Sequence, residues 1–254
     1  MQATARGLTA ESLAWDTAHF GLSIARIQIG CDDSGLGQAL TSARRDGLEL
    51  VYVFTPPEFS MPNDLLARFD GLKVDERVVF SIDLEVPHSD VASSDSLHLS
   101  EAPCREPSPA LIELAVAAGE YSRFAVDPRI PEDRFRRLYE VWIARSCLRE
   151  AADVVFVAEE PVTNPEPLGL ITASVRDGTG VIGLVAVSPT ARRRGVGRAM
   201  MSRVQEWLAA RGVKRSSVVT QEANGPACSL YRSCGYSPIQ RETIYHFRPC
   251  GSLA

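Results

Sequence analysis

The sequence predicts an α/β (α+β) fold in which a smaller α/β domain precedes a larger one. Apolar runs rich in β-branched residues alternate with amphipathic segments of helical period in both halves of the chain. The stretch between the halves is rich in serine, aspartate and proline, a composition typical of a linker or a long surface loop. We therefore expect a small domain at 1–86, a linker at 87–108 and a larger domain at 109–254.

Strands and helices alternate in the predicted N-terminal domain. The expected strands are 23–29, 48–54 and 77–86, and the expected helices are 36–45 and 63–69. The second strand should stop at Thr55-Pro56-Pro57, because proline cannot donate a hydrogen bond to a strand ladder.

The predicted C-terminal domain opens with two helices. The expected helices are 109–118, 131–149, 198–210 and 226–233, and the expected strands are 154–158, 168–176, 181–187, 215–221 and 237–247. Pro109 suits the first turn of a helix. Asp177-Gly178 predicts a tight hairpin between two of the strands.

Composition and charge exclude several classes of protein. No apolar run approaches the about 20 residues of a membrane span, so we expect no membrane partner. The N-terminus shows no apolar signal segment, which predicts a cytoplasmic location. A net charge of −5 argues against nucleic acid as a partner.

The cysteines and histidines show no ligand spacing. The six cysteines stand at 31, 104, 147, 228, 234 and 250, and the four histidines at 19, 88, 98 and 246. No cysteine pair has Cys-x-x-Cys spacing and the two residue types do not cluster, so no metal site is expected. Reduced thiols fit the predicted cytoplasmic location.

The segment 184–197 (LVAVSPTARRRGVG) has the features of a phosphate-binding loop. A strand stops at Ser188-Pro189, and a helix is expected to start near Gly195 and Gly197. Glycines let the backbone turn its N–H groups inward, and a helix N-terminus adds unpaired donors and a positive dipole. The surrounding basic residues are Arg192, Arg193, Arg194 and Arg198. The loop is therefore expected to hold a pyrophosphate. It contains neither Gly-Lys-Ser/Thr nor Gly-x-Gly-x-x-Gly, so the P-loop and the dinucleotide fingerprint do not fit.

Two motifs in this order resemble the GNAT superfamily of acetyl-CoA-dependent N-acetyltransferases. Arg192-x-x-Gly195-x-Gly197 matches the pyrophosphate signature Gln/Arg-x-x-Gly-x-Gly/Ala. The second signature, Asn-x-x-Ala-x-x-x-Tyr-x-x-x-Gly-Phe/Tyr, is matched by Asn224, Ala227, Tyr231, Gly235 and Tyr236. The resemblance implies a GNAT fold with a mixed central sheet and acetyl-CoA as co-substrate.

The same resemblance implies the residues that bind acetyl-CoA. They are Val185, Ala186, Val187, Arg192, Arg193, Arg194, Gly195, Val196, Gly197, Arg198 and Asn224. The main chain of Ala186 and Val187 would hold the pantetheine arm like an added strand. A backbone N–H near Val185 or Val187 would stabilise the oxyanion formed when an amine attacks the thioester.

Tyr231 is the expected general acid, because a phenol can protonate the departing thiolate. The general base stays open: Glu159, His246, Tyr245 and an ordered water chain are alternatives. Each of these side chains also has an ordinary structural interpretation.

A narrower resemblance covers more of the chain. Trp15-Asp16-x-x-x-Phe20-Gly21, the stretch 121–124, the helix 134–143 and the ending 245–248 are similar to TDP-fucosamine N-acetyltransferases. These enzymes acetylate the 4-amino group of a nucleotide-linked 4-amino-4,6-dideoxygalactose. Arg123 would then pair with a diphosphate, because a guanidinium matches phosphate oxygens bidentately. Phe124 and Trp15 would line the acceptor site.

Other functions stay open at this point. The acceptor is expected to be a small-molecule amine, with a protein, peptide or antibiotic amine as the alternative. A non-catalytic acyl-CoA-binding module is the alternative outside enzymes, and the intact glycine loop together with Tyr231 argues against it. A homodimer is left open as the assembly.

Overall fold

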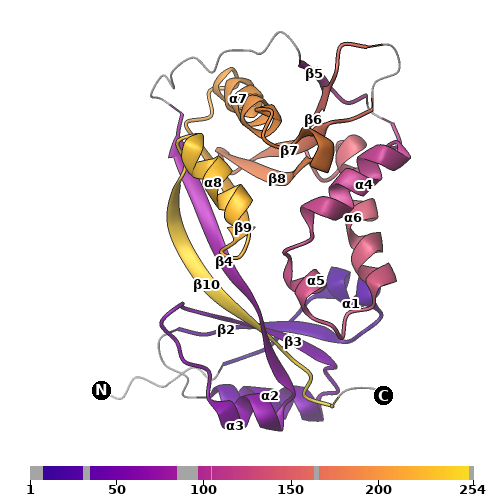
Figure 1. The fold of residues 1–254 in the computed structure, drawn as a ribbon. Helices are drawn as coiled ribbons and strands as arrows, with labels where there is room; N and C mark the ends of the chain where they lie inside the picture. Colours follow the sequence, from indigo (N-terminus) through magenta and orange to yellow (C-terminus); the bar gives the residue numbers. More distant parts are fainter. Residues whose placement is uncertain (1–7, 31–34, 85–96, 104, 163–165, 252–254) are drawn as a thin grey trace. The chain divides into compact units, whose positions relative to one another are not determined.

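A computed structural model describes residues 8–30, 35–84, 97–103, 105–162 and 166–251 (Figure 1). The strands are β1 (Glu11–Ser12), β2 (Ile24–Gln28), β3 (Leu50–Thr55), β4 (Gly71–Asp83), β5 (His98–Glu101), β6 (Val154–Glu159), β7 (Gly169–Arg176), β8 (Thr179–Val187), β9 (Arg215–Gln221) and β10 (Ser237–Phe247). The helices are α1 (Ala14–Phe20), α2 (Leu36–Arg45), α3 (Asn63–Arg68), α4 (Pro109–Ala118), α5 (Arg123–Val126), α6 (Glu132–Cys147), η1 (Pro189–Ala191), α7 (Val196–Ala209) and α8 (Gly225–Ser233). No helix of the described residues has the length and apolarity to cross a bilayer.

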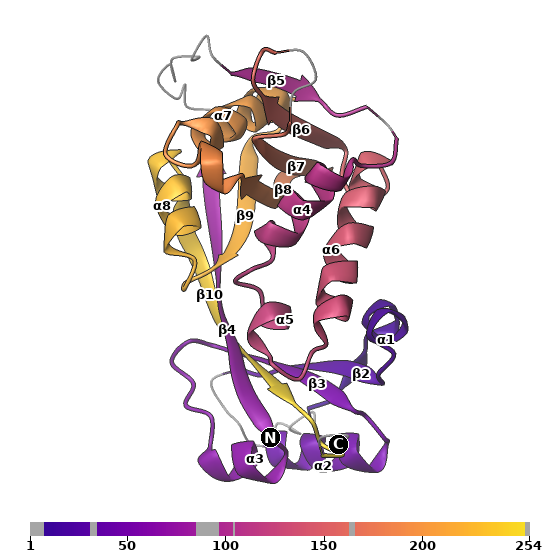
Figure 2. The same cartoon turned by 45° about the vertical axis from the view of Figure 1, so that its right-hand side comes forward.

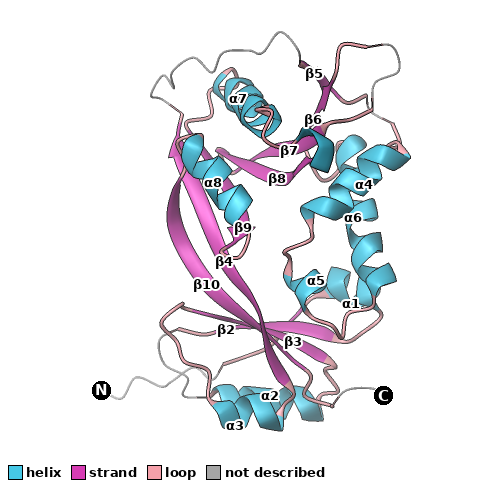
Figure 3. Cartoon of the chain, viewed as in Figure 1, coloured by secondary structure: helices cyan, strands magenta, loops and turns pink. Residues whose placement is uncertain are grey.

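The strands pair in the order β1-β2-β3-β10-β4-β9-β8-β7-β6-β5. Parallel pairs, β2 with β3 and β8 with β9, occur beside antiparallel ones such as β6 with β7 and β7 with β8 (Figure 3). This is a mixed sheet, so the predicted fold class is confirmed.

The chain divides into two compact units that are interleaved along the sequence. The first consists of 1–77, 122–134 and 241–254, and the second of 78–121 and 135–240. The segment 241–254 belongs to the first unit because β10 pairs with β3 from Thr243 to Phe247. The units thus follow contacts in space, whereas the predicted boundaries at 86 and 109 follow composition along the chain.

In the first unit, helices cover both faces of the strands (Figure 1). Strand side chains alternate between faces, so Val51 and Val53 of β3 pack with Leu36 and Leu40 of α2 on one face. On the opposite face Tyr52 of β3 lies against Phe124 of α5, at 6.2 Å between ring centroids. The second face also carries polar side chains, among them His246, whose ring lies 4.7 Å from that of Tyr52.

In the second unit, the main apolar core lies between the strands and the pair α7 and α8. Met200, Val204 and Leu208 of α7 are buried there with Phe156 and Ile171. Helix α4 packs against β7 and β8, and it lies on the other side of these strands from α7 in both Figure 1 and Figure 2. The strands are therefore sandwiched between helices.

Most predicted elements are present, and several differ in their bounds or were not predicted. Asp177 and Gly178 have φ of 50° and 75°, as the predicted tight hairpin requires. Strand β4 starts at Gly71, six residues before the predicted 77. His98–Glu101, inside the predicted linker, form β5 because they pair antiparallel with β6. Helices α1 and α5 were not predicted, and both are short.

Candidate active site

A β-bulge interrupts β8 in the second unit. The register with β7 shifts by one residue between Ile171 and Ala173, so Gly183 and Leu184 of β8 together face Thr172. The amide of Leu184 donates to Thr172 Oγ1 at 2.8 Å. A Cβ on Gly183 would lie only 2.7 Å from the same oxygen, so position 183 favours glycine.

Past the bulge, alternate residues of β8 direct their backbone groups away from β7. Ser188 donates its N–H to the carbonyl of Leu168 at 2.8 Å. Hydrogen-bonded pairs alternate along an antiparallel ladder, so Ala186 also directs its N–H and C=O to β7. Val185 and Val187 therefore direct theirs to the opposite edge. Ala186, expected to help hold the pantetheine arm, lies in the wrong register for that role.

The neighbouring strand does not follow this edge. Strand β9 pairs with β8 only from Thr179 to Ile182, whereas β8 continues to Val187. In the described chain the ladder between β8 and β9 therefore ends before Val185. An extended chain can add to such an edge by main-chain hydrogen bonds, as the pantetheine arm would.

The loop after β8 turns sharply into α7. Arg193 and Gly195 have φ of 65° and 82°, in the left-handed region. Gly195 is the N-cap of α7 and makes no side-chain capping bond. Ala199 donates to the carbonyl of Gly195 at 3.0 Å, so the amides of Val196–Arg198 precede the first intrahelical bond. Such amides are free to bind an anion at the helix N-terminus.

The arginines of this loop lie at or near the surface and make local contacts. Arg192 Nε donates to the carbonyl of Val187 at 3.4 Å. Arg194 pairs with Glu160 at 2.8 Å, and about half of each side chain is exposed. Exposed pairs contribute about 0–1 kcal/mol, so these side chains can turn to a phosphate at little cost.

Gly197 has a packing role in addition to its place in the motif. A Cβ there would lie 3.1 Å from Cδ2 of Leu230 on α8 and 3.7 Å from Val187. The absence of a side chain thus lets the first turn of α7 approach α8. Gly195 differs, because a Cβ there would meet no atom within 4 Å and only its positive φ favours glycine.

Asn224 begins α8. Its side-chain oxygen accepts from the N–H of Ala227 at 3.1 Å, which makes it the N-cap of this helix. The side-chain amide donors are not used in this bond, so the predicted contact with pantetheine stays a prediction.

Tyr231, two residues before the end of α8, is buried in the core of the second unit with 4% of its surface exposed. Its ring lies 5.8 Å from that of Phe80 and 6.4 Å from that of Tyr236. Burial raises the pKa of the Tyr231 phenol well above its ordinary value. The hydroxyl is therefore protonated at physiological pH, as a general acid must be.

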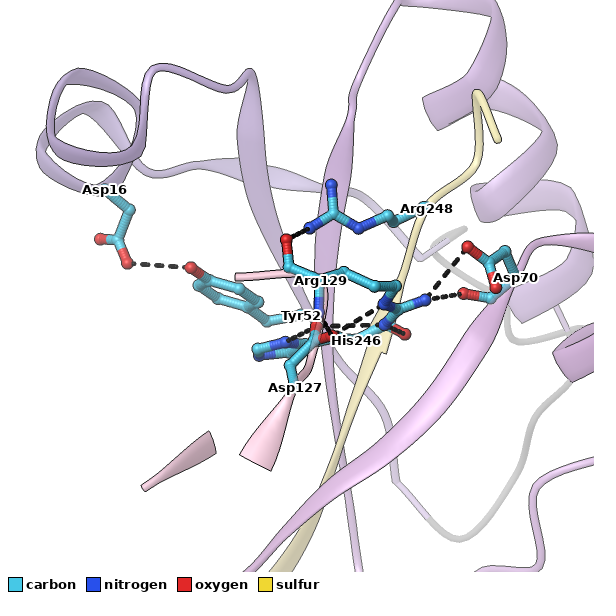
Figure 4. Close-up of polar contacts among 7 residues, drawn as sticks. All are labelled: Asp16, Tyr52, Asp70, Asp127, Arg129, His246 and Arg248. Atoms are coloured by element: carbon cyan, nitrogen blue, oxygen red, sulfur yellow. Dashed lines mark hydrogen bonds and ion pairs between the residues drawn. The ribbon is translucent and has the colours of Figure 1, made fainter. Parts of the chain in front are cut away.

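His246, one of the candidates for the base, lies in a buried polar network of the first unit (Figure 4). Its Nδ1 lies 2.8 Å from Oδ2 of Asp127, and Asp127 also accepts from Arg129 Nε at 2.8 Å. Arg129 reaches Asp70, and Arg248 donates to the carbonyl of Arg129. Sequence reasoning missed this network, because no local signal links residues so far apart in the chain.

Burial and hydrogen bonds in this network shift the pKa values of His246 and Asp127. Burial lowers the pKa of His246 to about 4, against the hydrogen bond to Asp127, which raises it. Burial alone would raise the pKa of the Asp127 carboxyl, but the hydrogen bonds from His246 and Arg129 outweigh it and hold that pKa below its usual range. His246 is thus neutral at pH 7. Its Nε2 is buried and has no hydrogen-bond partner within the described residues.

The other two base candidates occupy ordinary positions. Glu159 is the last residue of β6, where it pairs with His98 of β5. Tyr245 is buried in the core between the strands and α2, and burial raises its pKa. Neither arrangement indicates that the side chain accepts a proton from the amine, so the general base stays unassigned.

The predicted acceptor-binding residues all belong to the first unit. The guanidinium of Arg123 lies 4.4 Å from the ring centroid of Phe124 and 4.9 Å from that of Tyr52. Its Nε is buried without a hydrogen-bond partner among the described residues. Trp15 is 45% exposed and stacks on His19 at 5.0 Å. Tyr231 and the residues expected to bind acetyl-CoA, by contrast, belong to the second unit.

Comparison with known proteins shows what the region around the glycine loop is similar to. Residues 114–236, a little under half of the chain, match the model of the Acetyltransferase (GNAT) family. A crystal structure of a GCN5-related N-acetyltransferase from Sphaerobacter thermophilus has a TM-score of 0.60, with 18% identity, covering 96% of this chain and 77% of that one. The chain therefore has the GNAT fold, and residues 114–236 are similar to the Acetyltransferase (GNAT) family.

Two relatives show how far the sequence similarity reaches. Acetyl transferase GW6a of Oryza sativa subsp. japonica is 40% identical over 62 residues, which are 24% of this chain and 15% of that protein. The spore coat polysaccharide biosynthesis protein SpsD of Bacillus subtilis is 26% identical over 140 residues, 55% of this chain and 47% of SpsD. The chain thus spans less than half the length of each of these relatives.

Proposed function

We propose that the protein is an N-acetyltransferase that moves the acetyl group of acetyl-CoA to a primary amine by direct attack. The observation that carries this proposal is the strand edge at which the backbone groups of Val185 and Val187 point away from β7 and are not paired with β9. This edge leads into the glycine loop and the start of α7. The edge suits the amides of pantetheine, and the helix start suits a pyrophosphate.

The proposed mechanism follows from the backbone of β8 and from Tyr231. The amine attacks the thioester carbonyl, and the oxygen that becomes negative receives a hydrogen bond from the N–H of Val185 or Val187. The tetrahedral intermediate then collapses: the carbonyl re-forms, the carbon–sulfur bond breaks, and Tyr231 gives its proton to the thiolate. The amine nitrogen loses one proton to solvent water, and the Tyr231 phenolate regains one from solvent. A backbone donor held in a sheet is already oriented before the charge develops, so it stabilises the transition state more than the substrate.

The proposed acceptor is an amine of a nucleotide-linked amino sugar, such as the 4-amino group of a 4-amino-4,6-dideoxygalactose. SpsD, a relative over half of the chain, is named for polysaccharide biosynthesis. Arg123 supports an anionic acceptor, because its guanidinium lies against three rings and its buried Nε has no partner among the described residues. An unpartnered buried donor is costly unless a ligand completes it.

The decisive experiment is a thiol-release assay with acetyl-CoA and a panel of amines. The panel contains a TDP-linked 4-amino sugar, the same sugar as a methyl glycoside, glucosamine, a lysine peptide and a linear diamine. We expect turnover to be fastest with the TDP-linked sugar. Turnover of the peptide alone would overturn the amino-sugar acceptor, and coenzyme A binding without turnover of any amine would overturn the enzymatic function.

Arg123→Ala tests the anion contact in the same assay. Loss of a charge-assisted contact to phosphate should raise KM for the TDP-linked sugar about tenfold or more. KM for the methyl glycoside, which has no phosphate, should stay within about twofold because it lacks that contact. Arg26→Ala is the matched control, since Arg26 is exposed and pairs with Glu11 in the same unit. Equal effects on both sugars would contradict a role in phosphate binding.

A further inference from the structure

Helix α6 carries a row of three aromatic side chains in the second unit. Phe135 and Tyr139 lie 5.2 Å apart between ring centroids, and Tyr139 stacks on Trp142 at 5.9 Å with an angle of 21°. Tyr139 sits where a Cβ of Gly119 would be, so glycine at 119 makes room for its ring. Two of the rings are at least partly buried, whereas Trp142 is 37% exposed.

The exposed indole lies against the bulge of β8. A Cβ built on Gly183 would lie 3.7 Å from Cζ2 of Trp142, at van der Waals distance. Gly183 directly follows Ile182, where pairing with β9 ends, and lies two residues before Val185. The indole is therefore placed beside the backbone that would hold the thioester.

The C-terminal part of β9 presents uncharged side chains on the face that carries Trp142, whereas Arg215, at the start of the strand, pairs with Asp83. Val218 of β9 is in the core with α7, so by alternation Ser217, Val219 and Gln221 direct their side chains to the face of Trp142. Val219 is 39% exposed. An aromatic surface flanked by a hydroxyl and an amide suits a sugar ring, whose C–H groups pack on the indole while its hydroxyls bond to polar groups.

We infer that Trp142 is a specificity-determining residue on which the acceptor's ring lies, with Val219 beside it. This inference rests on the proposed function and narrows it to acceptors that carry a saturated ring near the amine. A linear amine gains less from this surface, because it has no saturated ring to pack on the indole.

Trp142→Ala and Trp142→Phe test the inference in the thiol-release assay. We expect Trp142→Ala to raise KM about tenfold or more for the amino sugar that the wild-type protein turns over, and Trp142→Phe to recover part of the loss. KM for acetyl-CoA and for the linear diamine should stay within about twofold, because neither uses the indole. Leu148→Ala is the matched control: Leu148 is 43% exposed just past the end of α6.

Tryptophan fluorescence gives a readout that does not depend on turnover. In a Trp15→Phe background, which removes the other exposed indole, adding the methyl glycoside of the 4-amino sugar should quench the emission. Trp142→Phe in the same background should remove that change while Trp207, buried in the core, still emits. Turnover of the sugar with an unchanged KM in Trp142→Ala would overturn this inference and leave the proposed function intact. Turnover of the linear diamine but of no sugar would also overturn it, whereas the absence of any turnover would overturn the proposed function itself.

Discussion

Acid should destabilise this protein through one buried histidine, His246. Burial lowers the pKa of its imidazole from 6.5 to about 4, and no part of its side chain is exposed. The charged groups around it are Asp127, whose carboxylate raises the pKa, and Arg123 and Arg129, which lower it. In the unfolded chain the same imidazole takes up a proton at its ordinary pKa, so protons favour unfolding.

The direction and the size of the change in unfolding free energy follow from the difference between the folded and unfolded pKa of His246. Between pH 6.5 and about 4 the unfolded state binds a proton that the folded state does not, so the free energy of unfolding decreases as the pH falls through this window. Each pKa unit corresponds to about 1.4 kcal/mol, which gives a loss of about 3 kcal/mol. Protonation of Asp127 adds a further loss at lower pH, because its pKa is held below the unfolded value.

The assay is urea unfolding, followed by circular dichroism, from pH 7.5 down to pH 4, for wild type and His246→Asn. Asparagine can donate an N–H to Asp127 but does not titrate, so the difference between the two pH profiles isolates the histidine. His98→Asn, on the exposed His98 of β5, is the matched control and should follow wild type. Parallel profiles for wild type and His246→Asn would refute the argument that burial keeps this imidazole neutral.

Two further predictions concern the acetyl-CoA site. Tyr231→Phe should lower kcat about 10²–10⁴-fold with little change in KM for acetyl-CoA, as expected for loss of a general acid. Tyr236→Phe, which removes the bond to Ser216 Oγ, should cost stability and spare kcat; single-turnover rates near wild type for Tyr231→Phe would exclude the acid role. Gly195→Ala should weaken coenzyme A binding in calorimetry, because it strains a backbone with φ of 82° at the loop. Gly212→Ala places the same strain, at φ of 71°, after the other end of α7, and equal affinities in the two variants would contradict the phosphate role of the loop.

Local chemistry was enough to predict most elements and the two GNAT motifs. The helices 36–45 and 109–118 and the strands 215–221 and 237–247 have the predicted ends, because glycine, proline and apolar periodicity act within a few residues. The glycine loop could be predicted for the same reason, because Gly195 is the N-cap of α7 and Gly197 lies in its first turn. The candidate general acid Tyr231 followed from its spacing to Asn224 in a known motif.

Long-range pairing decided the rest. Pairing of β10 with β3 gives 241–254 to the first unit and buries His246 beside Asp127, residues 119 positions apart that no local pattern connects. The bulge at Gly183 depends on the register of β7 with β8, and it sets which of Val185, Ala186 and Val187 face away from β7. Composition and periodicity thus determine where strands and helices form, whereas the hydrogen-bond register between strands determines which backbone groups remain available to a substrate.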